Sequence, residues 1–414
     1  MINAPKGTED ILPSDSFKWQ YIENKFSKIC SKYGFKEIRT PMFENTDLFN
    51  RSIGETTDIV TKEMYTFNDQ KGRSITLKPE GTSPVVRAFI QSGGQREMQP
   101  IKYFYDTPCF RYEKPQAGRL REFHQFGVET FGSNSMMADA EIIALAEEFL
   151  NAMGLKNIKL MINSVGCNKC RPAYREKLKE YLKSNYESLC DNCKKRYEKN
   201  PMRVLDCKDE NCKSISKKAP KMVEYLCDEC RDAFSELKEN LKLFKIDFNV
   251  DTGIVRGLDY YTKTAFEFIT DAIGAQGTIC GGGRYDHLIE EIGGMDIPGV
   301  GFGLGKERLL LLMKSQNAAI PYNKKTFFVA FTGEDTKEHA INLIVKLRNN
   351  GMNAIFDTKE RNLKGQMKYA DRADADYTII IGEDEIKSCF VTLRNMKDKN
   401  EEKLTVDELI ERFK

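Results

Sequence analysis

The chain has 414 residues, of which 40% are hydrophobic and 30% charged, and a formal net charge of +2. At about 150 residues per domain, this length predicts two or three domains, and the apolar share excludes a wholly disordered chain. The nearly neutral charge argues neither for nor against a nucleic-acid partner. The sequence lacks both the run of roughly 20 apolar residues that spans a membrane and a signal-peptide core. We therefore expect a cytoplasmic protein without a membrane partner.

Residues 1–162 have the periodicities of a mixed α+β domain. Apolar side chains at helical spacing predict helices over residues 14–33 and 136–153. Residues 35–41 predict a short strand that ends at a proline. Alternating patterns predict further strands over residues 74–77, 101–105, 123–131 and 158–162.

Cysteines are concentrated in residues 163–240, which hold eight of the 12 in the chain. They form the close-spaced pairs Cys167–Cys170, Cys190–Cys193, Cys207–Cys212 and Cys227–Cys230. Such pairs in a reducing compartment are typical of thiolate zinc ligands, four to each ion. The alternative is a set of reduced structural cysteines, and spacing alone does not determine which pairs combine. We therefore predict an inserted Cys-rich domain that is a candidate for structural Zn²⁺.

The remainder of the chain predicts a second strand-rich segment and a separate small domain. Strand-like patterns occupy residues 248–251, 266–269, 279–280 and 299–305, and a helix follows over 306–313. A polar linker comes next. Residues 325–414 then alternate strands with helices, which predicts a small α/β domain around a central sheet.

Residues 299–305 alternate glycine with valine, phenylalanine and leucine. Their spacing matches neither the dinucleotide-binding loop nor the Walker phosphate loop. Alternating glycines on a strand indicate the close approach of a neighbouring strand or a flat ligand, and tight strand–helix packing is the simpler alternative. Because the following helix carries Arg308 in its first turns, its N-terminus is a candidate phosphate site.

Four cations lie in the predicted loop between the strands at 101–105 and 123–131: Arg111, Lys114, Arg119 and Arg121. Aromatic residues flank them. This composition suits a polyphosphate nucleotide or RNA, although a solvated charged hairpin would have the same composition.

These stretches resemble, in order and spacing, motifs of the class II aminoacyl-tRNA synthetases. Residues 14–41 are similar to motif 1, a dimer-interface element, residues 110–129 to motif 2, and residues 299–309 to motif 3. Residues 77–82, Leu-Lys-Pro-Glu-Gly-Thr, resemble an amino-acid-binding loop in which Lys78 replaces the usual arginine.

Three further stretches narrow the resemblance to the histidyl-tRNA synthetase family. Residues 255–261, Val-Arg-Gly-Leu-Asp-Tyr-Tyr, and residues 281–286, Gly-Gly-Gly-Arg-Tyr-Asp, resemble its two signatures, and residues 365–371 resemble part of its anticodon-binding domain. The resemblance implies a multidomain fold of α+β and α/β type. An antiparallel-sheet catalytic domain would comprise residues 1–162 and 241–318, with the helical, Cys-rich insertion at 163–240 and an α/β anticodon-binding domain at 325–414.

The reaction implied is activation of L-histidine by ATP, with Mg²⁺, to histidyl-adenylate, followed by transfer to the 3′ end of tRNA(His) by a homodimer. Attack of a carboxylate on the α-phosphorus brings two anions together, so cations must face the transition state. The resemblance implies that Arg111 and Arg256 are these catalytic cations. The implied ATP-binding residues are Arg111, Glu113, Phe123 and Arg308.

The histidine substrate needs a carboxylate for its ammonium group and polar partners for its imidazole, because an unpaired buried polar group costs about 1–3 kcal/mol. Gln125 and Glu129 should share a strand face, since their separation is even. The resemblance implies that the histidine-binding residues are Glu80, Gly81, Thr82, Arg111, Gln125, Glu129, Arg256, Tyr260 and Tyr261.

Three alternative functions remain open from the sequence. A non-catalytic, synthetase-like regulatory subunit of histidine biosynthesis would typically lack the anticodon-binding domain and a well-preserved 255–261 signature, and both are present here. A zinc-ribbon RNA-binding protein would leave Arg111, Arg256 and Arg308 without a purpose. A class II synthetase for another amino acid is disfavoured by Tyr260 and Tyr261.

Overall fold

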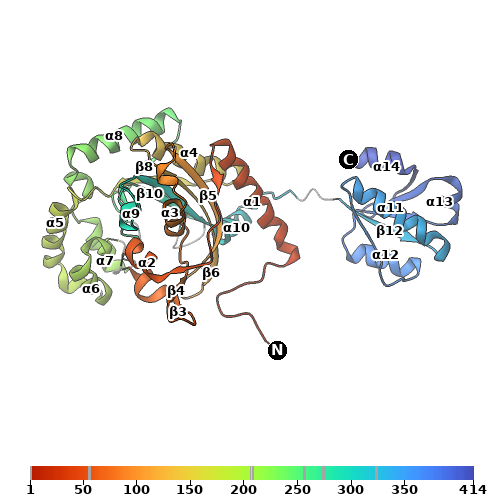
Figure 1. The fold of residues 1–414 in the computed structure, drawn as a ribbon, viewed down its shortest axis with the longest axis horizontal. Helices are drawn as coiled ribbons and strands as arrows, with labels where there is room; N and C mark the ends of the chain where they lie inside the picture. The colour runs from red at the N-terminus through yellow and green to blue at the C-terminus, as the bar shows by residue number, and fades with distance from the viewer. Residues whose placement is uncertain are drawn as a thin grey trace. The chain divides into compact units, whose positions relative to one another are not determined.

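The computed structural model describes residues 2–54, 57–205, 207, 209–254, 258–272, 277–321 and 325–414. The chain divides into two compact units, Met1–Ile320 and Pro321–Lys414, both drawn in Figure 1. Each unit is built on its own central β-sheet. No helix in the described ranges has the length and apolar character needed to cross a membrane.

An eight-stranded sheet forms the centre of the first unit. Its pairings are antiparallel except for the two edge pairs, β1 with β5 and β7 with β8. The strands lie in the order β1 (Lys36–Glu37), β5 (Ile101–Phe110), β6 (Glu122–Phe131), β11 (Gly299–Gly305), β10 (Thr278–Arg284), β9 (Thr262–Ile269), β7 (Lys159–Ser164) and β8 (Asn249–Val250).

One face of this sheet packs against the largest apolar core of the molecule. The helices on this face are α1 (Pro13–Lys32), α4 (Met136–Ala152), α8 (Asp228–Leu243) and α10 (Lys306–Ser315). In β6, Phe126 and Val128 are fully buried in this core. Because side chains alternate along a strand, Gln125 and Glu129 lie on the opposite face, as predicted.

The opposite face of the sheet packs against shorter helices: α2 (Thr46–Ile53), α3 (Thr82–Gln91) and α9 (Leu288–Glu291). A small three-stranded sheet lies beside them, in the order β2 (Phe43–Asn45), β4 (Ser74–Leu77), β3 (Tyr65–Asn68). The short segments η1 (Ile59–Glu63) and η2 (Gly94–Arg96) complete this layer.

The Cys-rich insertion is helical and has a small core of its own, in which cysteine side chains are prominent. Leu237 and Leu241, near the end of α8, are instead buried in the core beneath the large sheet, so α8 joins the insertion to the sheet. The segments before α8 are α5 (Arg171–Ser184), η3 (Tyr186–Ser188), α6 (Asp191–Lys199), η4 (Pro201–Val204), α7 (Glu210–Lys217) and η5 (Met222–Tyr225).

The second unit is an α/β domain whose five-stranded sheet has apolar clusters on both faces. Its sheet order is β13 (Asn353–Phe356), β12 (Thr326–Phe331), β14 (Tyr377–Ile381), β15 (Val391–Asn395) and β16 (Glu401–Leu404). The first three strands are parallel, and β15 and β16 are antiparallel to their neighbours. The helical segments are η6 (Glu334–Thr336), α11 (Lys337–Asn349), α12 (Leu363–Arg372), α13 (Glu383–Ser388) and α14 (Val406–Phe413).

Candidate active site and candidate metal centres

A cavity of about 290 Å³ lies over the centre of the large sheet. It is lined by the N-termini of α3 and α10, the β5–β6 loop and strands β6, β10 and β11. The predicted site residues that line it are Glu80, Thr82, Arg111, Glu113, Phe123, Gln125, Tyr260, Tyr261 and Arg308. Residues separated by more than two hundred positions in the sequence therefore meet in one cavity.

Two other predicted residues adjoin this lining, and one lies outside the described residues. The Gly81 N–H donates to Oε1 of Gln125 at 3.0 Å. Glu129 is fully buried and accepts a hydrogen bond from the Tyr105 hydroxyl at 3.1 Å. Arg256 lies outside the described residues, so its role stays a prediction.

The alternating glycines of β11 make room for side chains of β6. A Cβ atom built on Gly301 would overlap the Glu129 carboxylate, and one built on Gly303 would overlap the amide of Gln125. The strand lies in the centre of the sheet, between β6 and β10. The predicted close approach is therefore real, and its reason is space for two polar side chains beside the cavity.

Arginine side chains gather at one end of the cavity. The Arg111 guanidinium lies 5.3 Å from the centroid of the Phe123 ring, and its Nε donates to the Pro79 carbonyl at 2.8 Å. Arg308 donates to the Thr278 carbonyl at 2.6 Å. Burial lowers the pKa of Arg308, and the nearby Arg119 lowers it further. Such a concentration of fixed positive charge favours a polyphosphate ligand.

The loop cations predicted as one cluster are divided by the structure. Arg119 lines the cavity and pairs with Glu113 at 2.8 Å. Arg121 lies instead over the Tyr112 ring, 4.0 Å from its centroid, and its Nε donates to the Glu113 carbonyl at 3.2 Å. The loop thus directs only part of its positive charge toward the cavity.

Glu80 is held at the start of α3, where its carboxylate accepts backbone N–H groups. Oε2 accepts from Thr82 at 2.8 Å and Oε1 from Ser83 at 2.7 Å. These are the unsatisfied donors of a helix N-terminus, and they fix the position of the carboxylate. Oε1 also accepts from the Ser83 hydroxyl. Oε2 can accept a second hydrogen bond, which leaves capacity for a ligand ammonium group.

Glu129 is the buried acid of the site. Its carboxylate accepts from the hydroxyls of Tyr105 and Tyr285. Burial raises the pKa of Glu129 to about 8, although hydrogen bonds from Tyr285, Thr82 and Tyr105 counteract the rise. The raised pKa favours the protonated carboxyl group near neutral pH, so Glu129 can exchange a proton with a ligand that has a nitrogen acceptor.

Sequence reasoning missed Tyr105 and Tyr285 as partners of Glu129. Tyr105 lies directly across from Gly127 in the β5–β6 register, and a Cβ on Gly127 would overlap its ring. Tyr285 follows the glycines of β10, and its ring centroid lies 5.6 Å from that of Tyr260. A glycine opposite an aromatic residue was the available signal, but it became visible only with the strand register.

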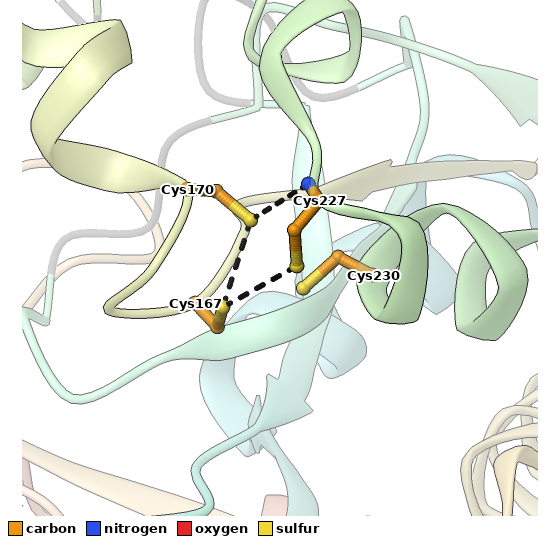
Figure 2. Close-up of side chains that lie close together, drawn as sticks. All are labelled: Cys167, Cys170, Cys227 and Cys230. Atoms are coloured by element: carbon orange, nitrogen blue, oxygen red, sulfur yellow. Dashed lines mark hydrogen bonds between the residues drawn. The ribbon is translucent and has the colours of Figure 1, made fainter.

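The eight clustered cysteines form two groups, each with its ligand atoms within 4.8 Å of one another. The first joins Cys167 and Cys170 to Cys227 and Cys230, as Figure 2 shows. The second joins Cys190 and Cys193 to Cys207 and Cys212. The pairing that the sequence left open is thus decided by the fold.

The sulfur positions fit a tetrahedral metal site. Cys167 Sγ lies 3.6 Å from the sulfur of Cys170 and 3.9 Å from that of Cys227, and Cys190 Sγ lies 3.8 Å from that of Cys207. A Zn–S bond of about 2.3 Å gives a tetrahedral sulfur–sulfur edge of about 3.8 Å, whereas a disulfide bond is about 2.05 Å. The donor set therefore suits Zn²⁺ rather than disulfides.

Matches to two family models cover nearly the whole chain. Residues 7–309 match the model described as Histidyl-tRNA synthetase, and residues 318–414 match the one described as Anticodon binding domain. These matches confirm the predicted fold class, with an antiparallel catalytic sheet, a helical Cys-containing insertion and a C-terminal α/β domain.

Curated relatives and a solved structure align over the full length. The histidine–tRNA ligase of Caldanaerobacter subterraneus subsp. tengcongensis is 56% identical over 410 residues, 99% of this chain and 98% of the relative. That of Thermoanaerobacter sp. strain X514 is 56% identical over 415 residues, 100% of this chain and 99% of the relative. The apo histidyl-tRNA synthetase of S. aureus aligns with a TM-score of 0.84 at 39% identity and 100% coverage of both chains.

Proposed function

The chain belongs to the histidyl-tRNA synthetase family, and we propose that the cavity over its large sheet is where it activates histidine. The enzyme is a histidine–tRNA ligase, which forms histidyl-adenylate and pyrophosphate from histidine and ATP and then transfers the histidyl group to tRNA(His). Full-length relatives of this activity at 56% identity support the ligase over the regulatory-subunit alternative. ATP is the substrate, and Mg²⁺ accompanies it to neutralise part of its phosphate charge.

The arginine end of the cavity receives the phosphates of ATP. Arg111 faces the α-phosphate, where it stabilises the charge that develops as the histidine carboxylate attacks. Arg308 binds the phosphates farthest from the adenosine. Phe123 stacks on the adenine ring, and Glu113 accepts a hydrogen bond from the adenine amino group. The positions of Arg111, Glu113, Phe123 and Arg308 around one cavity support these roles. Arg256 is proposed as the second catalytic cation from the family resemblance alone.

The opposite end of the cavity receives histidine. Glu80, held at the start of α3, accepts a hydrogen bond from the ammonium group, beside Thr82. The imidazole lies against Gln125, Tyr260 and Tyr261, and Glu129 beneath them exchanges a proton with a ring nitrogen. Because Glu129 is buried and has a raised pKa, it can donate to a neutral imidazole or accept from one.

Convergence of the predicted residues on one cavity is the observation that carries this proposal, and ATP–pyrophosphate exchange with each of the twenty amino acids tests it. We expect exchange with histidine alone. The Arg308→Ala variant should raise the KM for ATP at least tenfold, about 1.4 kcal/mol of lost phosphate binding. Arg73→Ala, on an exposed side chain paired locally with Asp69, is the matched control. A folded protein that shows no exchange with any amino acid would contradict the proposal.

We further propose that each group of four cysteines binds one structural Zn²⁺, since the sulfur–sulfur distances fit its coordination. The insertion has a small core, and a bound metal offsets the entropy of ordering it. Metal analysis of the purified chain should find two zinc ions, and Cys167→Ser and Cys190→Ser should each lose one. A zinc-free, folded protein with eight titratable thiols in this region would reject the sites.

We also propose that the protein is a homodimer and that it acts in the cytoplasm. The motif 1 resemblance of α1 and the residues after it implies a dimer, and exposed apolar side chains nearby, such as Leu12, Met42 and Phe43, support it. The second unit binds the anticodon of tRNA(His), in keeping with its family match. Sedimentation equilibrium should give twice the chain mass, and a monomer at micromolar concentration would reject the dimer.

A further inference from the structure

Residues of the insertion contact the histidine-signature segment, residues 255–261, on the side away from the cavity. Of that segment, the structure describes residues 258–261. Tyr260 and Tyr261 face the cavity, but Asp259 points the other way. Its Oδ1 accepts from Nη2 of Arg203 at 3.2 Å and from Nδ2 of Asn200 at 3.3 Å. Both partners belong to the insertion.

Arg203 and Asn200 lie in a stretch that the second cysteine group encloses. Cys190 and Cys193 precede η4, and Cys207 and Cys212 follow it. A 3-10 segment of four residues has little helical stability of its own, so its position depends on its anchors. Holding the four sulfurs together would keep the stretch from residue 193 to residue 207 closed as a loop and Arg203 in place against Asp259.

Arg171 makes a second contact of the same kind, next to the first cysteine group. It directly follows Cys170, and its Nε donates to the Val165 carbonyl at 3.1 Å. Its Nη2 donates to the carbonyl of Tyr261. The backbone beside it is tied as well, because Lys263 N–H donates to the Gly166 carbonyl at 2.9 Å. A guanidinium of the insertion thus fixes the backbone of a tyrosine that faces the cavity.

The space between these arginines is too small for a substrate. The cavity that Arg171, Asn200, Arg203, Asp259 and Tyr261 help to line has a volume of about 50 Å³, which holds one or two water molecules. The contact is therefore a joint between the insertion and the signature segment rather than a second ligand site.

We propose that Arg203 and Arg171 are positioning residues that connect the two cysteine groups to the histidine-signature segment, so that metal occupancy of the insertion sets the affinity of the enzyme for histidine. This inference rests on the proposed histidine site and on the proposed zinc ions. Loss of metal would release η4 and the start of α5, and residues 259–261 would then sample other conformations. Binding of histidine would have to select the competent one, which raises its apparent dissociation constant. The ATP end, built on the β5–β6 loop and α10, does not depend on this joint.

Steady-state exchange kinetics of Arg203→Met and Cys207→Ser in the full-length protein test the inference. We expect each to raise the KM for histidine about tenfold, as the loss of a charge-assisted hydrogen bond allows, while the KM for ATP and the kcat at saturating histidine change less than twofold. Direct titration of histidine by calorimetry should show the same loss of affinity. Arg203→Lys, which keeps the charge, should recover part of it.

The double variant Arg203→Met/Cys207→Ser should be no worse than Cys207→Ser alone, because both changes act through one contact. Arg203→Met should keep two zinc ions, and Cys207→Ser should keep one. Lys213→Met, at an exposed cation of α7 that pairs with Glu210, is the matched control within the insertion.

The outcomes separate this inference from the proposals beneath it. No histidine-dependent exchange in the unaltered protein would reject the function, and absence of zinc would reject the metal sites. Normal exchange and two zinc ions, with an unchanged histidine KM in Arg203→Met, would overturn only the proposed positioning role of Arg203. An equal rise in both substrate KM values would also overturn it, because that is the effect of general destabilisation.

Discussion

Replacing Glu129 by glutamine should remove a large pH dependence from the stability of the catalytic unit. The carboxyl group is fully buried, and burial raises its pKa to about 8 from the ordinary 4.5. In the unfolded chain the same group ionises near pH 4.5. Between these two values the folded protein therefore holds a proton that the unfolded chain releases, so stability falls as the pH rises through this window. Glutamine cannot ionise and keeps an oxygen that can accept from Tyr105 and Tyr285.

The size of the effect follows from the two pKa values. Stability changes by up to about 1.4 kcal/mol for each pH unit over which one proton is released on unfolding. From pH 6 to pH 8, ionisation of Glu129 should lower the free energy of unfolding of the unaltered protein by about 2 kcal/mol. The Glu129→Gln variant should not show this decrease. Other groups titrate in both proteins, so the difference between their unfolding free energies isolates this carboxyl group.

The single tryptophan of the chain provides the assay. Trp19 lies in α1, with its ring 4.9 Å from the His124 ring and 4.9 Å from Lys306 Nζ, so its fluorescence reports unfolding of the catalytic unit. Urea titrations at pH 6, 7 and 8 would give the two free energies. A difference between the two proteins that stays constant from pH 6 to pH 8 would refute the reasoning, because Glu129 would then be ionised when folded.

Three further predictions follow from the packing. Arg284→Met removes the cation that pairs with the fully buried Asp139, so urea titration followed by Trp19 fluorescence should show that the free energy of unfolding falls by about 3–5 kcal/mol. A fall below about 1 kcal/mol would contradict this. Gly127→Ala places a methyl group where the Tyr105 ring lies. We expect the free energy of unfolding in the same titration to fall by about 1–3 kcal/mol and histidine-dependent exchange to be impaired. Unchanged values for both would contradict the packing. Thr405→Ala removes the N-cap of α14, so hydrogen exchange should show a loss of about 1 kcal/mol confined to the second unit, and equal loss in α4 would contradict that assignment.

The sequence predicted the elements whose periodicity reflects one buried face. The helix over residues 136–153 is α4 (Met136–Ala152), and the strand over residues 123–131 is β6 (Glu122–Phe131). The predicted strand over residues 35–41 was too long, because only Lys36–Glu37 pairs with β5. In the second unit neither β15 nor β16 was predicted as a separate strand, and the exposed edge sequence of β16, Glu401–Leu404, has almost no apolar alternation.

By itself the sequence determined the order of the motifs, the strand face shared by Gln125 and Glu129, and the presence of four close-spaced cysteine pairs. These properties are local, because spacing along one helix, strand or loop sets them. Only the tertiary structure decided which cysteine pairs combine, and that the hydroxyls of Tyr105 and Tyr285 meet on Glu129. Such contacts join segments far apart in the chain, and the strand register and helix packing that bring them together depend on the whole core.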